Sequence, residues 1–265
     1  VFRVAVSPVD GLIASASDDG EIRLWNGSTG KFVRTLGNQG SEAGALSFTR
    51  DGKRLVSTCG GGGCRNEPQI VWDVASGTRL LQPKHHDNIV LTVAISPDGR
   101  LVATGGGSNQ EIHVWDLATG QGKQVLAGSG ASRWTAGFSP DGRRIAWGAT
   151  SEYTSHNSRG PLEMQLRLPD AGQGLGEPEP LDLVSAKEFV RANAKHGAFT
   201  LVHRKGGDYG SGALLDLKSE DQTLATMERG STDGYEHRSY AFTPDGRTII
   251  SSASNGNLDA YDLHG

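Results

Sequence analysis

The sequence predicts an all-β fold built from repeated units of four short antiparallel strands. One phrase of alternating apolar and polar residues around a tight turn recurs along the chain of 265 residues, as expected of a repeat protein. Glycine is abundant, with 38 residues, which indicates many tight turns. No amphipathic helical pattern of useful length is visible, so strands must supply the core.

The recurring phrase predicts two strands on either side of a turn. It is clearest as "VAISPDGRLVAT" at residues 93–104, where the alternation on both sides of Pro-Asp-Gly indicates a hairpin. The other copies are "VAVSPVDGLIAS" at 4–15, "LSFTRDGKRLVST" at 46–58, "AGFSPDGRRIAWG" at 136–148, "YAFTPDGRTIISS" at 240–252 and a weaker "VRANAKHGAFTLV" at 190–202, with its turn expected at Asn193.

A third and a fourth strand complete each repeat. The third strand ends in an aromatic residue and a polar one, as in "IRLWN" (22–26), "IVWD" (70–73), "IHVWD" (112–116) and "LDAYD" (258–262), with degenerate versions "MQLRLPD" (164–170) and "ALLDL" (213–217). A small-residue turn then leads into a fourth strand such as "KFVRTL", "TRLLQP" or "KQVL". The predicted repeat boundaries are 1–39, 40–87, 88–130, 131–187, 188–234 and 235–265, the last one incomplete.

On these motifs the sequence resembles the WD-repeat β-propeller family, in the bacterial-type form rich in Ser-Pro-Asp-Gly-Arg turns. The resemblance covers almost the whole chain and implies a β-propeller of four-stranded antiparallel blades. Six repeats are visible, and a seven-bladed or longer array is the alternative for the full protein. A lone blade cannot bury both of its faces, so blades must stack and cover one another.

The same resemblance implies a structural hydrogen-bond network in each blade, running from a His through a Ser or Thr to a Trp. The third repeat keeps all three residues, as His86, Thr104 and Trp115. The first repeat keeps Ser15 and Trp25, and the second is interpreted as Thr58 and Trp72. The fourth has Trp147 where the Ser or Thr should be. The aspartates Asp18 and Asp19 are expected to act structurally in their turn.

Three long links between second and third strands are predicted to lie on one face, at residues 60–69, 148–161 and 204–212. Long loops on a rigid scaffold are where binding groups concentrate, although neutral drift is the alternative because loop extension costs little. Aromatic residues and arginines are typical interface anchors. The partner-binding candidates on this face are Arg65, Glu67, His85, Tyr153, His156, Arg159, Arg204, Tyr209, Tyr235 and Arg238, with His85 expected at the surface.

The two cysteines, Cys59 and Cys64, flank four glycines in the first of these links. A metal clip would need further ligands, and a phosphate-binding loop would need a following helix. A disulfide across the glycines is sterically conceivable. The expected state is two free thiols, with Cys59 packed between sheets and Cys64 exposed.

Composition and motifs disfavour several functions. The formal net charge is −4 and the isoelectric point about 6.1, so neither nucleic acid nor an anionic membrane is an expected partner. No hydrolase elbow, phosphate loop or metalloprotease helix motif appears. No cofactor or metal is expected, and a cytoplasmic location is expected from the lack of a leader. The sequence therefore favours a non-catalytic propeller that binds a protein or peptide. The alternatives are a regulatory or sensor module of a longer polypeptide with a protease-like or kinase domain, and a propeller hydrolase or lyase.

Overall fold

The computed structural model describes residues 1, 3–64, 68–109, 111–126, 135–139, 141–148, 164–167, 195–196, 199–206, 212–219, 222–228, 237–253 and 257–263. All regular elements in these residues are β-strands. Nearly all of them form antiparallel pairs with the strand that precedes or follows them in the sequence. These sheets confirm the predicted all-β class, and three of them confirm the four-stranded antiparallel unit.

Three four-stranded sheets follow one another in the first half of the chain. Sheet one contains β1 (Arg3–Val6), β2 (Leu12–Ala16), β3 (Glu21–Asn26) and β4 (Phe32–Asn38). Sheet two contains β5 (Ala43–Phe48), β6 (Arg54–Cys59), β7 (Gln69–Asp73) and β8 (Arg79–Leu81). Sheet three contains β9 (Val90–Ile95), β10 (Leu101–Gly106), β11 (Glu111–Asp116) and β12 (Gly122–Leu126).

Two further sheets lie in the second half of the chain. Sheet four contains β13 (Thr135–Phe138), β14 (Arg144–Gly148) and β15 (Met164–Arg167). Sheet five contains β16 (Lys195–His196), β17 (Phe199–Gly206), β18 (Gly212–Ser219), β19 (Gln222–Glu228), β20 (His237–Phe242), β21 (Thr248–Ala253) and β22 (Leu258–Asp262). It joins the strands of the last two repeats through a single pairing of Gly212 with His237.

The hairpin expected at Asn193 is wrong in position. Strands β16 and β17 pair through Lys195 with Thr200 and through His196 with Phe199, so the connection falls after His196. This repeat lacks the Ser/Thr-x-Asp-Gly turn that four of the other hairpins share, and without it the sequence offers no local marker of where the chain reverses.

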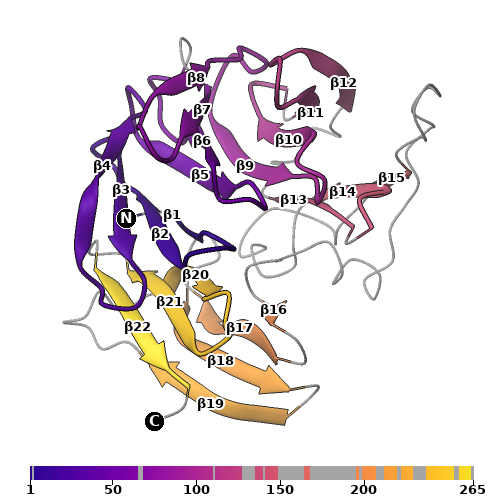
Figure 1. Cartoon of the computed structure of the whole chain (residues 1–265). Helices are drawn as coiled ribbons and strands as arrows, with labels where there is room; N and C mark the ends of the chain where they lie inside the picture. The colour runs from indigo at the N-terminus through magenta and orange to yellow at the C-terminus, as the bar shows by residue number, and fades with distance from the viewer. Residues whose placement is uncertain are drawn as a thin grey trace.

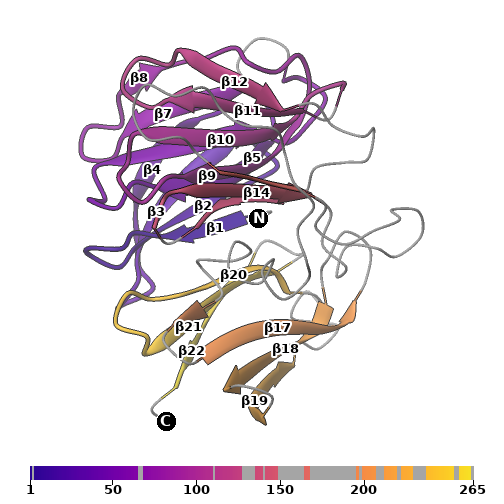
Figure 2. The same ribbon diagram turned by 90° about the vertical axis from the view of Figure 1, so that its right-hand side faces the viewer.

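The first strands of successive sheets contact one another. Strand β1 contacts β5, β5 contacts β9, and β9 contacts β13, while β20 contacts β1. Figure 1 shows β1, β5, β9 and β13 toward the inside of the arc that these sheets form, with β4, β8 and β12 toward the outside. Figure 2 shows sheets one to four stacked in layers, with the strands of sheet five below them.

Sheets two and three each bury both faces against the sheets beside them, because successive residues of a strand point to opposite faces. On β6, Leu55 packs in the cluster shared with sheet one, while the next residue, Val56, packs in the cluster shared with sheet three. On β10, Val102 faces sheet two and Ala103 faces sheet four. Burial between sheets therefore supplies the core that no single sheet could provide.

Four of the hairpins that join first and second strands share one turn geometry. In sheet three the Ser96 hydroxyl donates to Asp98 Oδ1 (2.6 Å), and Asp98 Oδ1 accepts the Arg100 amide (3.0 Å). Gly99 follows with a φ of 71°, a left-handed conformation that glycine adopts without strain. Thr49, Ser139 and Thr243 open the equivalent turns. These turns fix the hairpin register locally, which is why the sequence located them.

Candidate functional site

The links between sheets and the links between second and third strands meet at one end of sheets one to three, here called the loop face. It comprises residues 17–20, 38–42, 59–64, 85–89 and 106–109. Backbone hydrogen bonds join the two kinds of link, from Gln39 N to Gly20 O (2.8 Å), Gly60 N to Glu42 O (2.7 Å) and Gly107 N to Ile89 O (2.8 Å). The predicted common face is thus present in these three sheets.

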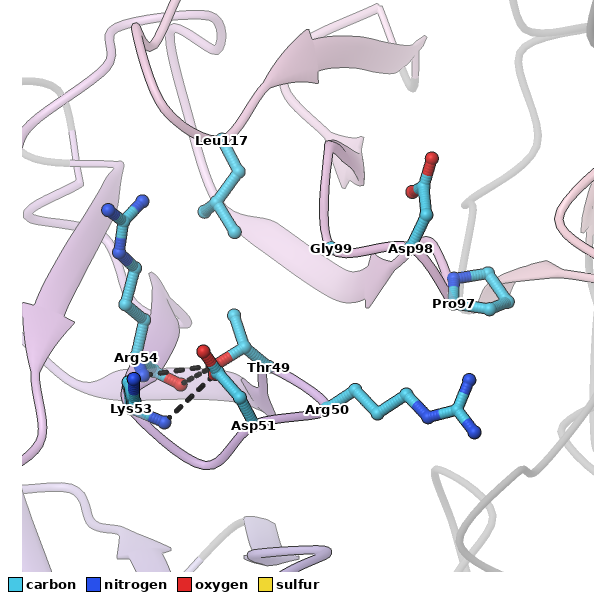
Figure 3. A pocket seen from close by; sticks show the side chains of 9 residues that line it. All are labelled: Thr49, Arg50, Asp51, Lys53, Arg54, Pro97, Asp98, Gly99 and Leu117. Carbon is cyan, nitrogen blue, oxygen red and sulfur yellow. Dashed lines mark hydrogen bonds between the residues drawn. The ribbon is translucent and has the colours of Figure 1, made fainter.

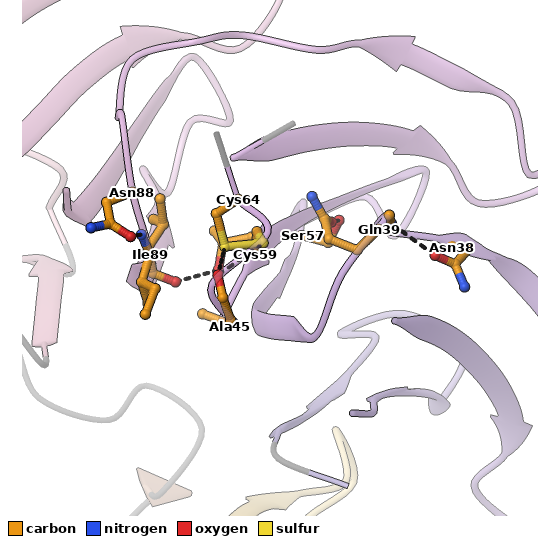
Figure 4. The surroundings of a disulfide bond; sticks show 12 residues. Asn38, Gln39, Ala45, Ser57, Cys59, Cys64, Asn88 and Ile89 are labelled. Carbon is orange, nitrogen blue, oxygen red and sulfur yellow. Dashed lines mark hydrogen bonds between the residues drawn. A yellow bond between two sulfur atoms is a disulfide. The ribbon is translucent and has the colours of Figure 1, made fainter. Parts of the chain in front are cut away.

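A disulfide closes the described part of the second sheet's long link. Cys59 and Cys64 are bonded, with Cα atoms 5.4 Å apart, and both are about 1% exposed. The expectation of two free thiols, with Cys64 exposed, is therefore wrong. The four intervening glycines let the chain turn back within five residues, which brings the sulfurs together. Figure 4 shows the disulfide between Asn88 and Ile89 on one side and Gln39 and Ser57 on the other.

Thr104 is the centre of the network in sheet three. Its Oγ1 lies 3.0 Å from His86 Nε2 and accepts hydrogen bonds from Trp115 Nε1 (3.2 Å) and, from the neighbouring sheet, Gln69 Nε2 (3.4 Å). A hydroxyl has one hydrogen and two acceptor sites, so a single side chain can link His86, Trp115 and Gln69. The predicted trio of His86, Thr104 and Trp115 is confirmed.

Burial, reinforced by the nearby His113, lowers the pKa of His86 to about 3. His86 is 6% exposed, and desolvation disfavours its charged form. The residue is therefore neutral at physiological pH and acts as a fixed hydrogen-bond partner.

Sheet two has the same network with a different first residue. Trp72 Nε1 donates to Ser57 Oγ (2.7 Å), and Ser57 Oγ donates to Gln39 Oε1 (2.5 Å). The interpretation of Thr58 as the Trp72 partner is wrong by one residue, because adjacent strand residues point to opposite faces. Two counts in the sequence identify Ser57. It lies eight residues after the turn residue Thr49, as Thr104 does after Ser96. Gln39 precedes Ser57 by eighteen residues, which is also the separation of His86 and Thr104.

Thr58 instead joins two sheets. Its Oγ1 accepts the Ala45 amide (2.8 Å) and donates to Val90 O (2.8 Å) at the start of β9. In sheet one the expected pair is confirmed, since Trp25 Nε1 donates to Ser15 Oγ (2.8 Å). Trp147 pairs across the ladder with Ala136, the register position that Thr104 has in sheet three, and it is 1% exposed.

His85 is held against sheet three. It is half-buried, with Nε2 3.0 Å from Gly120 O, and its ring stacks on His113 (centroids 5.8 Å apart) and lies near Trp115 (5.7 Å). Burial lowers its pKa. Its side chain therefore lies beside the turn between β11 and β12, and the expectation of a free surface residue on the loop face is wrong. Its part in partner binding stays a prediction.

The other predicted partner-binding residues are placed less fully. Arg204 lies in β17 and Arg238 in β20. Those outside the described residues are Arg65, Glu67, Tyr153, His156, Arg159, Tyr209 and Tyr235. The structure therefore brings only the first part of the predicted face together, around the disulfide.

The first sheet's short link is held by Asp19, as expected of a structural aspartate. Asp19 accepts the Glu21 amide (2.9 Å) and pairs with Arg23 (2.6 Å). The Arg23 guanidinium lowers the pKa of Asp19. Within the residues that the structure describes, no group of three or more His, Cys, Asp and Glu side chains could hold a metal ion. The same part of the chain contains no helix that could span a membrane.

A cleft on the opposite end of the sheets has no counterpart in the sequence-based prediction. It lies between the turns of sheets two and three and has a volume of about 570 Å³. Figure 3 shows its lining, which consists of Thr49, Arg50, Asp51, Lys53, Arg54, Pro97, Asp98, Gly99 and Leu117. The available signal was Arg50, which stands where other repeats have the turn proline.

Comparisons with known proteins support the family suggested by the repeats. The family described as "WD domain, G-beta repeat" matches residues 1–26 and 77–116. The chain is similar to Nuclear distribution protein nudF of Aspergillus niger, with 35% identity over 33% of this chain and 19% of the relative. It is similar to Anaphase-promoting complex subunit cdh1 of Dictyostelium discoideum, with 36% identity over 40% of this chain and 14% of the relative.

A third relative is Periodic tryptophan protein 2 homolog of Schizosaccharomyces pombe, 30% identical over 37% of this chain and 11% of the relative. The chain thus matches less than a fifth of the length of these three curated relatives. All three organisms are eukaryotes, so the expected bacterial type is not supported. The family match and the relatives thus show a likeness to WD-repeat proteins over these parts of the chain.

Proposed function

We propose that this chain is a non-catalytic interaction platform that binds a protein or peptide on the loop face. The observation that carries the proposal is the way the links gather there. Backbone hydrogen bonds tie the segment around Gln39 to Gly20 and to Gly60, and the segment around Ile89 to Gly107, while the Thr58 hydroxyl bonds to Val90 O of the next sheet. The names of two relatives, a nuclear distribution protein and a subunit of the anaphase-promoting complex, suit a regulatory interaction protein.

The disulfide loop supports this role energetically. A flexible binding loop must be ordered on association, and that ordering subtracts from affinity. The bond between Cys59 and Cys64 and the hydrogen bond from Gly60 to Glu42 hold the loop before any partner arrives. The surface is therefore pre-organised at the point where the predicted residues Arg65 and Glu67 follow in sequence.

A loop exchange between two repeats tests the proposal. The register of β6 and β7 pairs Thr58 with Gln69, and that of β2 and β3 pairs Ala16 with Ile22. Residues 59–68 can therefore be replaced by the shorter "SDDGE" of residues 17–21 without moving the flanking strands. Peptides selected from a random display library on the wild-type protein serve as probes. We expect their affinity to fall by at least about tenfold in the exchange variant.

The Arg247→Gln variant on the opposite end provides the matched control, and thermal melting checks that the exchange variant folds. A second exchange that trims residues 148–161 extends the test to the fourth repeat. If selected peptides bind both folded exchange variants as tightly as the wild type, the loop face is not the binding surface.

A second candidate function is a regulatory or sensor module of a longer polypeptide with a protease-like or kinase domain. The small share of each relative that the chain matches favours keeping this candidate. The full-length gene decides it, because a catalytic domain encoded beside these repeats would place the chemistry there. No observation on the described residues favours a propeller hydrolase or lyase.

A further inference from the structure

The cleft between the turns of sheets two and three is lined by three cationic side chains. Arg50, Lys53 and Arg54 line one side of it, and Pro97 and Leu117 line other parts. Its volume of about 570 Å³ falls in the range of ligand-binding pockets, about 300–1,000 Å³. Arg50 and Lys53 are exposed, while Arg54 is half-buried.

Within the described part of the chain, these three cations have no side-chain partner. None of them forms an ion pair with a carboxylate or donates a side-chain hydrogen bond. Arginines elsewhere are used internally, since Arg23 pairs with Asp19 and Glu21, and Arg34 donates to Val74 O and Ala75 O. The cleft therefore holds positive charge that the fold itself does not neutralise by direct contact.

Internal comparison shows that the turn does not require these residues. The position of Arg50 holds a proline in the equivalent turn of sheet three, Pro97, and proline suits such a turn because its φ is already restricted. The position of Arg54 holds Leu101 in sheet three and Leu12 in sheet one, whereas sheet four has Arg144 there. Sheet two thus departs from its neighbours at both positions, and both departures add a cation to the same cleft.

Each of the two carboxylates in the cleft already accepts hydrogen bonds on one of its two oxygens. Asp51 Oδ1 accepts the Thr49 hydroxyl (2.6 Å) and the Lys53 amide (3.1 Å), and the Thr49 hydrogen bond lowers the Asp51 pKa. Asp98 Oδ1 is used in the same way by Ser96 and Arg100. The cleft therefore offers three cationic donors together with carboxylate oxygens that can accept further hydrogen bonds.

We propose that this cleft binds an acidic peptide segment of a protein partner, as a second surface separate from the loop face. Carboxylate side chains of the segment pair with Arg50, Lys53 and Arg54, as charge complementarity favours. Its backbone amides donate to the open oxygens of Asp51 and Asp98. A nucleic-acid backbone fits less well, because its phosphates offer no donors to these aspartates.

The test uses a short dye-labelled peptide of alternating glutamate and serine, followed by fluorescence anisotropy. The Arg50→Pro/Arg54→Leu variant gives sheet two the residues that sheet three has, so the turn should be retained. We expect the wild type to bind the peptide at a single site, with binding weakened by salt. The double variant should lose at least about tenfold in affinity.

Arg247→Gln is the matched control, because it removes a cation from an equivalent turn outside the cleft, and it should change affinity less than about twofold. A peptide with glutamine in place of glutamate should not bind. The proposal is overturned if the wild type does not bind the acidic peptide, if the glutamine peptide binds equally, or if the control and the double variant lose affinity equally. Tighter binding of a single-stranded oligonucleotide at this cleft would also overturn it.

Discussion

Replacing Thr104 by valine keeps the shape of the side chain and removes its hydroxyl. In the wild type this hydroxyl satisfies Trp115 Nε1 (3.2 Å) and His86 Nε2 (3.0 Å), on residues that are 0% and 6% exposed. Each buried polar group left without a partner costs about 1–3 kcal/mol. We therefore expect Thr104→Val to lower the free energy of unfolding by about 2–6 kcal/mol, a large part of the roughly 5–15 kcal/mol typical of a domain.

Urea unfolding followed by circular dichroism and tryptophan fluorescence measures this loss, provided that the two signals coincide. Thr223→Val is the matched control, because Thr223 is an exposed strand residue on β19, and it should shift the midpoint little. Equal stabilities for the two variants would refute the role assigned to the Thr104 hydroxyl.

Three further predictions concern the buried network of sheet three and the disulfide of sheet two. Trp115→Ala should cost about 3–5 kcal/mol in urea unfolding, because it empties a fully buried site, and an unchanged midpoint would contradict the repeat alignment. His86 is protonated in the unfolded chain below a pH of about 6.5, but in the folded chain only below a pH of about 3. The free energy of unfolding should therefore decrease as the pH is lowered from about 6.5 to about 3. His86→Gln, which copies Gln39 of sheet two, should flatten the dependence of the unfolding free energy on pH, measured by urea unfolding at several pH values. An unchanged slope would contradict the assignment of this dependence to His86. Cys64→Ser should cost about 2 kcal/mol by opening a short loop, and faster hydrogen exchange around Cys59 should accompany it; protection equal to the wild type would show that the bond does not hold the loop.

The sequence predicted well wherever a feature was local. Four Ser/Thr-x-Asp-Gly turns sit where expected, since the side chain of the first residue, the aspartate and the glycine together specify the reversal. The networks in sheets one and three were also found, because His86, Thr104 and Trp115 keep their spacing. The repeat at residues 190–202 was misplaced because it has no such turn.

Features that depend on packing between segments were missed. Ser57 and Thr58 are both hydroxyl residues, and only the count from the turn shows which of them lies on the face of Trp72. The state of Cys59 and Cys64 depends on the path of the glycine loop, which composition does not specify. The cleft around Arg54 was missed because each turn is short by itself, and the cleft exists only where two turns lie side by side.

The hydrogen bonds that cross from sheet to sheet have a consequence for the cooperativity of unfolding. Thr58 bonds to Val90 O, Gln69 reaches Thr104, and Thr92 Oγ1 accepts the Ala136 amide (3.2 Å). Arrays of repeats often unfold in parts, because each unit interacts only with its neighbours. Here, loss of sheet two would leave polar atoms of sheet three unsatisfied, and loss of sheet three would do the same to sheet two. These sheets should therefore open as one cooperative unit, so that local fluctuations stay confined to the loops at their ends.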